Sequence, residues 1–193
     1  MEQFKKYIQQ FVSITEGEWE VLVPYLRERK LKKGEYLASM NQRYENEVFV
    51  IEGVVRGYCL TFHGEDVNVS FFTGPKIITP YFSRNIEHIH SLTYQALTDC
   101  TIYEFSASAF KELTMQYDNY RRFATLIVER ELKRITQKEI FLHSRNAEER
   151  YLFFREIHPG LENKIPLFHI ATYLGVTPMA LTDLKNKLNE EMA

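Results

Sequence analysis

The sequence is poor in the residues on which several classes of protein depend. It has only two cysteines, Cys59 and Cys100, so a disulfide framework, a four-cysteine zinc site and an iron–sulfur cluster all lack ligands. Both cysteines lie in strand-like runs, and we expect buried thiols. No stretch approaches the roughly 18 apolar residues of a membrane span, and the N-terminal MEQFKKYIQQF lacks a signal-peptide core. These absences predict a cytoplasmic protein that does not associate with membranes.

Neither sign of charge is in large excess, because the formal net charge is −2 at pH 7. If a chain with this balance binds nucleic acid, it must do so through a local patch and not through its overall field. The composition is 45% hydrophobic with 14 Phe and 12 Tyr, which excludes disorder and is typical of an ordinary globular protein.

The pattern of apolar residues changes along the chain. Residues 1–30 predict two helices, the second opened by a capping box in which Thr15 is followed by Glu18. From Lys30 to Phe105, short alternating runs broken by glycines predict a compact antiparallel β unit. Within it, VRGYCLTF runs through HGED into VNVSFF, which predicts a hairpin.

Beyond Ser106 the apolar residues recur at helical spacing. The stripe predicts a single helix from about residue 109 to about residue 142, roughly 50 Å long. The β unit is too small to cover the whole stripe, so we expect part of it to meet a second copy of the chain. Two shorter core helices are the alternative. The residues expected at the dimer contact are Leu113, Tyr117, Tyr120, Ala124, Ile127, Val128 and Ile135.

The segment from Ile165 to Leu188 has the spacing of a helix-turn-helix. Ala171 supplies the small residue where the two helices cross, and Gly175 supplies a turn that tolerates a positive φ. Thr177 is a natural N-cap of the second helix, and Pro178 suits its first position. A helical hairpin in a protein that does not bind DNA is the alternative.

With a β unit, a long helix and a helix-turn-helix in this order, the chain resembles the Crp/Fnr family of bacterial transcription regulators over nearly its full length. The stretches that carry the resemblance are KKGEYL (32–37), VFVIEGVVRGY (48–58), AEERY (147–151) and IPLFHIATYLGVTPMALTDLKNKL (165–188). The resemblance implies an α+β fold with an antiparallel β jelly-roll sensor domain of the cyclic-nucleotide-binding type. A long dimerisation helix and a small, winged-helix-like DNA-binding domain would follow. The implied ranges are 1–108 for the N-terminal helices and sensor, 109–143 for the dimerisation helix and 144–193 for the DNA-binding domain.

The resemblance also bears on the effector. Family members that bind cyclic nucleotides hold them with a Gly-Glu pair and an Arg-Ser or Arg-Thr pair, because a bidentate guanidinium matches phosphate oxygens. Here Ile78 and Thr79 stand at the first pair, and His90 and Ser91 at the second. We therefore expect that cyclic AMP is not the effector. The alternative is an unknown anionic ligand, which a protonated His90 could hold. The candidate effector-binding residues are Thr79, Arg84, His90 and Ser91.

His88 and His90 are also spaced like the His-x-His pair of the cupin enzymes, which share the roll topology and bind a catalytic metal. Cupins place a Glu four or five residues after the pair, where this chain has Tyr94 and Gln95. The family resemblance places His88 in a loop before the strand. We therefore expect no metal, no cofactor and no enzymatic activity, and a cupin-type metal enzyme is the less favoured alternative.

We expect a homodimer that binds an inverted repeat in double-stranded DNA. The residues expected to meet DNA are Thr177, Met179, Thr182, Asp183, Lys185 and Lys187. Related helices usually carry Arg or Glu near Met179 and Arg at Asp183, and an aspartate there repels phosphates. The chain ends five residues after Leu188, which leaves little for a wing. A structural or protein-interaction relic that no longer binds DNA is therefore the alternative.

Overall fold

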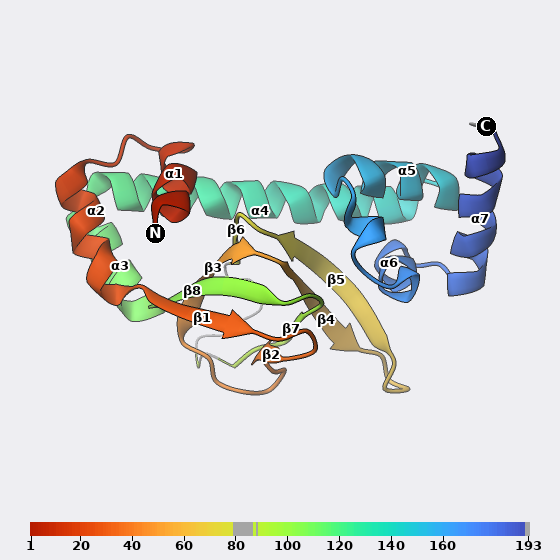
Figure 1. Ribbon diagram of the computed structural model, residues 1–193, viewed down its shortest axis with the longest axis horizontal. Helices are drawn as coiled ribbons and strands as arrows, with labels where there is room; N and C mark the ends of the chain where they lie inside the picture. Colours follow the sequence, from red (N-terminus) through yellow and green to blue (C-terminus); the bar gives the residue numbers. More distant parts are fainter. Residues whose placement is uncertain (79–86, 88, 192–193) are drawn as a thin grey trace. The chain divides into compact units, whose positions relative to one another are not determined.

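The computed structural model describes residues 1–78, 87 and 89–191, and Figure 1 shows its helices and strands. Contacts within the chain divide it into two compact units. The first consists of Met1–Gly57 and Phe71–Lys133, and the second of Tyr58–Ser70 and Arg134–Ala193. A short internal piece of the chain, Tyr58–Ser70, therefore belongs to the same unit as the C-terminal segment.

The first unit contains most of the β roll, and the end of one strand and the start of the next belong to the second unit. The strands of the roll are β1 (Arg27–Leu31), β2 (Tyr36–Ala38), β3 (Asn46–Glu52), β4 (Val54–Leu60), β5 (Asp66–Thr73), β6 (Lys76–Ile78), β7 (Thr93–Ala96) and β8 (Cys100–Ser106). They form two four-stranded sheets, in the orders β1-β8-β3-β6 and β2-β7-β4-β5. The pairs of β8 with β1 and β3, of β2 with β7 and of β3 with β6 are antiparallel. The antiparallel β unit expected from the alternating runs is confirmed, and so is the fold class that the family resemblance implied.

Alternation along β3 lets one strand serve two cores. Val48 and Val50 belong to the apolar cluster between the two sheets, together with Ile102 of β8 and Val55 of β4. Phe49 points to the opposite face, because successive side chains of a strand alternate. There it joins the cluster formed with the helices.

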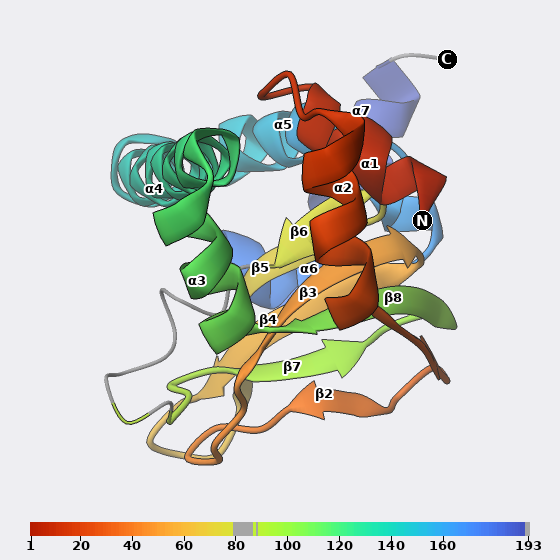
Figure 2. The same ribbon diagram turned by 90° about the vertical axis from the view of Figure 1, so that its left-hand side faces the viewer.

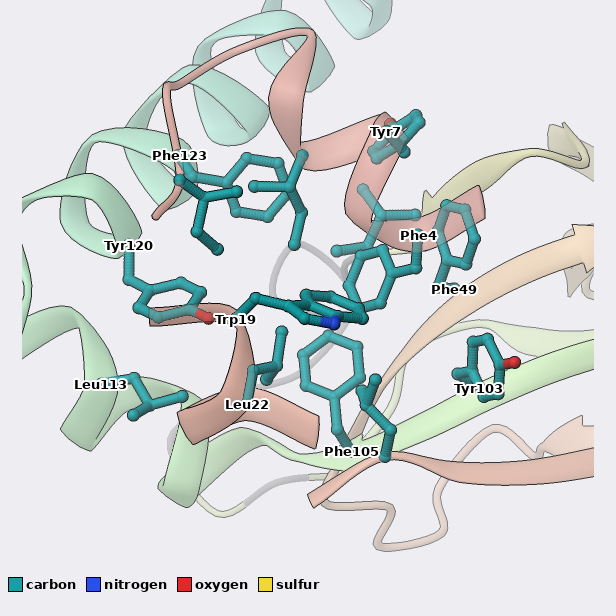
Figure 3. Packing of buried hydrophobic residues seen from close by; sticks show 14 of the residues in the cluster. Phe4, Tyr7, Trp19, Leu22, Phe49, Tyr103, Phe105, Leu113, Tyr120 and Phe123 are labelled. Atoms are coloured by element: carbon teal, nitrogen blue, oxygen red, sulfur yellow. The ribbon is translucent and has the colours of Figure 1, made fainter. Parts of the chain in front are cut away.

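Helices cover that second face of β3. They are α1 (Glu2–Gln9), α2 (Glu16–Leu22), the short 3-10 helix η1 (Val23–Tyr25), α3 (Ala107–Gln116) and α4 (Asp118–Ser144). Figure 2 shows α1, α2 and α3 on one side of the strands. The Phe4 ring stacks on Phe49 with centroids 4.4 Å apart, and Trp19 meets Phe4 edge-on at 6.3 Å. Figure 3 shows this cluster, in which Phe123 of α4 is fully buried.

Local signals placed the start of α2 correctly. The Thr15 hydroxyl accepts a hydrogen bond from the Glu18 backbone N–H at 3.2 Å, and the Glu18 carboxylate accepts one from the Thr15 N–H at 2.8 Å. Both bonds satisfy backbone donors that the first turn of a helix leaves without partners. The capping box predicted from the sequence is confirmed.

The single helix predicted from residue 109 is wrong, because the structure interrupts it at Tyr117. This residue has φ −125° and ψ 123°, an extended conformation that ends α3. Asn119, at the start of α4, donates hydrogen bonds to the Ser13 carbonyl and to the Glu18 carboxylate. The bonds hold this turn against the link between α1 and α2, a long-range constraint that apolar spacing does not reveal.

The second unit is mainly helical. It contains the end of α4, then α5 (Ala147–Ile157), the 3-10 helix η3 (Leu161–Asn163), α6 (Leu167–Leu174) and α7 (Pro178–Glu191). It also contains the segment Tyr58–Ser70, called the hairpin below. The hairpin is closed by bonds from Thr61 N–H to Glu65 O (2.9 Å) and from Gly64 N–H to Thr61 O (3.0 Å). The predicted hairpin is confirmed.

The two cysteines differ in their surroundings. Cys100 of β8 is a buried thiol, as expected, whereas Cys59 is only half-buried. The expectation fails for Cys59 because it lies near the end of β4, where exposure rises to 46% at the next residue, Leu60. Within the described residues, no helix is long and apolar enough to cross a membrane.

Gly53, between β3 and β4, tests how tightly the roll is packed. Its φ is +94°, and an added Cβ would lie 2.5 Å from Asp99 O and from Cys100 Sγ. We expect Gly53→Ala to lower the free energy of unfolding by at least about 2 kcal/mol, through backbone strain and overpacking. Urea denaturation measures this. In the control, Gly64→Ala, φ is +80° but nothing lies within 4 Å, so only the strain applies. Equal losses in the two variants would contradict the packing argument.

Candidate nucleic-acid interface

The start of α5 is fixed by its own sequence. The Asn146 side chain accepts a hydrogen bond from the Glu149 N–H at 2.9 Å, and the Glu149 carboxylate accepts one from the Asn146 N–H at 3.1 Å. This is a second capping box. From it α5 runs on to bury Tyr151 and Phe154. The AEERY stretch therefore forms the first helix of the C-terminal segment.

The turn between α6 and α7 has the geometry that the sequence predicted. Gly175 has φ +66°, in the left-handed region, and ends α6. The Val176 N–H donates to Ala171 O at 3.0 Å, and Ala171 is fully buried where the helices meet. Arg150 of α5 donates to Leu174 O at 2.7 Å. A backbone carbonyl at the end of α6 thus has a charged partner, which favours a fixed turn.

α7 begins at Pro178, with Thr177 as its cap. The Thr177 hydroxyl accepts a hydrogen bond from the Ala180 N–H at 3.2 Å. Leu181 and Leu188 are buried, at 0% and 8% exposure. The opposite face of α7 is therefore open to a ligand.

That open face contains part of the predicted DNA-binding set. Met179 is 76% exposed, and Thr182 and Asp183 are also exposed. Asn186, which the sequence reasoning missed, is exposed three residues after Asp183 and four after Thr182, and this spacing places it on the same face. The helical period of the sequence alone would have placed Asn186 on this face.

The two lysines of the predicted set are less available. Lys185 is half-buried, and Lys187 Nζ lies 3.1 Å from a Glu148 carboxylate oxygen of α5. Other basic residues of this unit are also paired, Arg145 with Glu149 at 3.2 Å and Arg155 with Glu162 at 3.3 Å. The positive potential that α7 presents to a phosphate is therefore modest.

Lys138 of α4 lies at the base of the hairpin. Its amine donates hydrogen bonds to Val69 O at 2.8 Å and to Asn68 O at 3.4 Å. It also lies 3.8 Å from the centre of the Tyr173 ring of α6. Burial, followed by the charge of Arg134, lowers the pKa of this amine to about 7. Lys138 thus links α4, the hairpin and α6 in a poorly solvated position.

The predicted effector residues are only partly described. Thr79 and Arg84, like His88 of the metal hypothesis, lie outside the described residues. His90 is 1% exposed, and its Nε2 lies 3.3 Å from Tyr44 O. Ser91 is exposed. Among the described residues, no group of three His, Cys, Asp or Glu side chains could hold a metal ion.

A buried arginine in the roll was also missed. Arg56 of β4 is 4% exposed, and its Nε and Nη2 donate to Gln95 Oε1 at 3.0 and 2.7 Å. Gln95 in turn donates to Gly34 O at 2.9 Å. Since Val55 faces the core between the sheets, Arg56 faces the other side of its sheet. The chain of bonds fastens β4 and β7 to the turn before β2.

The predicted dimerisation residues divide into two groups. Leu113, Tyr120 and Ile127 are buried in the core that α1 and α2 complete, so the chain itself covers them. Tyr117, Ala124 and Val128 are half-buried. Ile135 is 38% exposed, and the neighbouring Leu132 is 55% exposed. The apolar surface still available on α4 therefore lies in its later turns.

Comparison with known proteins adds to these observations. The family model of the cyclic nucleotide-binding domain matches residues 28–117. The chain is similar to the transcriptional activator protein Anr of Pseudomonas protegens and to the transcriptional activator protein FnrA of Stutzerimonas stutzeri. Each is 27% identical over 128 residues, 66% of this chain and 52% of the relative. The chain thus spans about half the length of the curated relatives it matches.

Solved structures share the fold. FixK2 from Bradyrhizobium japonicum superposes with a TM-score of 0.76 at 18% identity, over 86% of this chain and 85% of that one. The c-di-GMP responsive global regulator CLP from Xanthomonas campestris has a TM-score of 0.71 at 14% identity, over 92% and 93% of the two chains. Identities this low show similarity of fold alone.

Lys138 gives a pH-dependent prediction. In the unfolded chain a lysine holds its proton up to about pH 10, whereas the folded pKa is about 7. Between these values the unfolded state binds more protons, so stability rises with pH, by at most about 1.4 kcal/mol per unit. We expect the free energy of unfolding of the wild type, minus that of Lys138→Met, to grow over this window in urea titrations. Lys133→Met, at an exposed position of the same helix, is the control. A constant difference would show that Lys138 is not a buried, titrating amine.

Proposed function

We propose that the chain is a homodimeric, DNA-binding transcription regulator of the Crp/Fnr type that responds to a ligand other than cyclic AMP. The proposal assigns sensing to residues 1–108, dimerisation to 109–143 and DNA binding to 144–193. It includes no catalytic step and no metal.

The observation that carries the proposal is the geometry of α6 and α7. A buried alanine, a left-handed glycine and a threonine N-cap occur in the order that a helix-turn-helix requires. The second helix keeps one face open, with Met179, Thr182 and Asp183 exposed along it. A helix with such a face can enter a major groove.

Electrostatics suggest weak binding that depends on salt. Asp183 lies on the open face, and Lys187 is within ion-pair distance of Glu148. Thr177, Thr182 and Lys185 remain as groups that can meet phosphates or bases, and the N-terminus of α7 favours an anion. The acidic Asp183 and the pairing of Lys187 with Glu148 also favour a second candidate function. In that alternative the chain is a relic that acts only through protein contacts.

The dimer is proposed through the later turns of α4. Leu132 and Ile135 are exposed there, with Ala124 and Val128 half-buried at spacings of four along the same helix. Apolar residues at such spacing suit a helix pair related by a two-fold axis. Tyr120 and Ile127 support the dimer indirectly, since they anchor α4 to its own roll, and Leu113 does the same for α3.

The effector proposal rests on what replaces the phosphate-binding groups. Ile78 is fully buried and His90 nearly so, and neither supplies a carboxylate for a ribose or a guanidinium for a phosphate. The proposed effector is an unidentified anionic ligand that uses Thr79, Arg84, His90 and Ser91. Cyclic AMP does not suit this set.

DNA binding is tested by selecting bound sequences from a pool of random duplexes. We expect an inverted repeat with half-sites about 34 Å apart, and an affinity that falls steeply with added salt. Asp183→Arg should strengthen binding, by roughly 1–3 kcal/mol if a guanine lies opposite. Glu112→Arg, an equal change of charge at an exposed position of α3, should have little effect. If neither the native protein nor Asp183→Arg shifts any duplex at low salt, the relic is the better description.

The dimer is tested by light scattering at micromolar concentration. We expect a dimer for the native chain, and a monomer for the double variant Leu132→Glu with Ile135→Glu, because two carboxylates cannot be buried cheaply in an apolar contact. Met115, on α3, is 69% exposed, so Met115→Glu should leave the dimer intact. A monomeric native protein would refute the proposed contact.

A further inference from the structure

The hairpin is hydrogen-bonded to α6 of the helix-turn-helix at Thr172, and Asn68 Nδ2 also lies 3.4 Å from His169 Nδ1. Asn68 is 1% exposed, and its backbone N–H and side-chain amide both donate to Thr172 Oγ1 of α6, at 3.3 and 2.7 Å. The hydroxyl donates onward to His169 O at 3.2 Å. It accepts two bonds from the hairpin and gives one to its own helix, which uses its full hydrogen-bonding capacity. Figure 1 shows α6 beside β5, the strand that carries Asn68.

The same hairpin is fastened to α4. Arg134 Nη2 donates to Ser70 Oγ at 3.0 Å, and Lys138 donates to the carbonyls of Val69 and Asn68. Lys138 also lies against the ring of Tyr173, the residue after Thr172. α6 is therefore tied to α4 through the hairpin, in addition to the covalent path through α5.

These contacts leave the open face of α7 uncovered. The hairpin bonds to Thr172 of α6, whereas Met179, Thr182 and Asp183 of α7 are exposed. The hairpin therefore fixes the motif without masking it. A contact of this kind sets orientation and does not compete with a ligand.

We propose that Asn68 and Thr172 are positioning residues for DNA binding, which hold α6 in a fixed orientation to α4 and so set the separation of the two recognition helices. The inference rests on the proposed function. In a dimer formed along α4, any rotation of α6 relative to α4 changes the distance between the two copies of α7. Half-sites of an inverted repeat are met together only at one separation. A motif without this support must also be ordered when DNA binds, which costs affinity.

The test is the dependence of affinity on half-site spacing. The probes are the inverted repeat selected by the native protein and duplexes in which its half-sites are moved by one or two base pairs. Thr172→Val removes the hydroxyl and keeps the shape of the side chain. We expect it to weaken binding to the selected spacing on the order of tenfold, the worth of about one hydrogen bond. Affinity for the duplexes with shifted half-sites should hardly change. The preference for the selected spacing, which is the ratio of the two affinities, should therefore decrease.

Matched variants separate positioning from general damage. Asn68→Ala should flatten the preference in the same way, and Thr172→Ser, which keeps the hydroxyl, should restore it. Thr125→Val removes a hydroxyl on α4 that bonds only locally, to Arg121 O at 3.0 Å, and should change nothing. An equal loss at every spacing would show a merely structural contact and overturn the inference.

Amide hydrogen exchange gives a readout that needs no DNA. Thr172→Val should speed exchange in α6 and in the hairpin, and unchanged exchange there would overturn the inference. If the native protein prefers one spacing and Thr172→Val keeps that preference, only the positioning role is wrong. If the native protein selects no duplex at all, the proposed function is wrong and the positioning role falls with it.

Discussion

The stacking of Phe4 on Phe49 is the interaction on which the rest of the structure depends. With centroids 4.4 Å apart, it joins the first helix to the second face of β3, where Trp19 and Phe123 complete the cluster. Burial of each such ring contributes about 1.5–3 kcal/mol. The cluster covers Tyr120, Phe123 and Ile127, which lie on one face of the first half of α4. The large exposed apolar side chains of α4, Leu132, Ile135 and Ile140, lie in its later turns.

Features that depend on neighbouring residues could be predicted from the sequence. The capping box of Thr15, the left-handed turn at Gly175 and the cap at Thr177 each involve groups within three or four positions of one another. The antiparallel β unit followed from alternation, because a period of two allows one arrangement of faces. Its jelly-roll topology was implied only by the family resemblance. The exposed face of α7 followed from its helical period, apart from Asn186.

Features that depend on distant residues could not be predicted. The break at Tyr117 accompanies bonds from Asn119 to Ser13 and Glu18, about a hundred positions earlier. The pairing of Lys187 with Glu148 removes a cation that the sequence offered to DNA. Arg56 is a single charged residue within an apolar run, and nothing in that run indicates that Gln95 is its partner. Each case is a tertiary contact that overrides a correct local pattern.

The hairpin also bears on which parts of this chain could be exchanged as separate modules. Its residues, 58–70, lie in the middle of the roll sequence, yet by their contacts they belong with residues 134–193. The C-terminal unit is therefore discontinuous along the chain. A chimera that exchanges everything after α4 would separate Thr172 from Asn68 and Tyr173 from Lys138. An exchange that keeps the hairpin, the end of α4 and the helix-turn-helix together would preserve both contacts. The hydrogen bonds between Asn68 and Thr172 therefore favour joint inheritance of the hairpin and the helix-turn-helix, although the two segments lie far apart in the sequence.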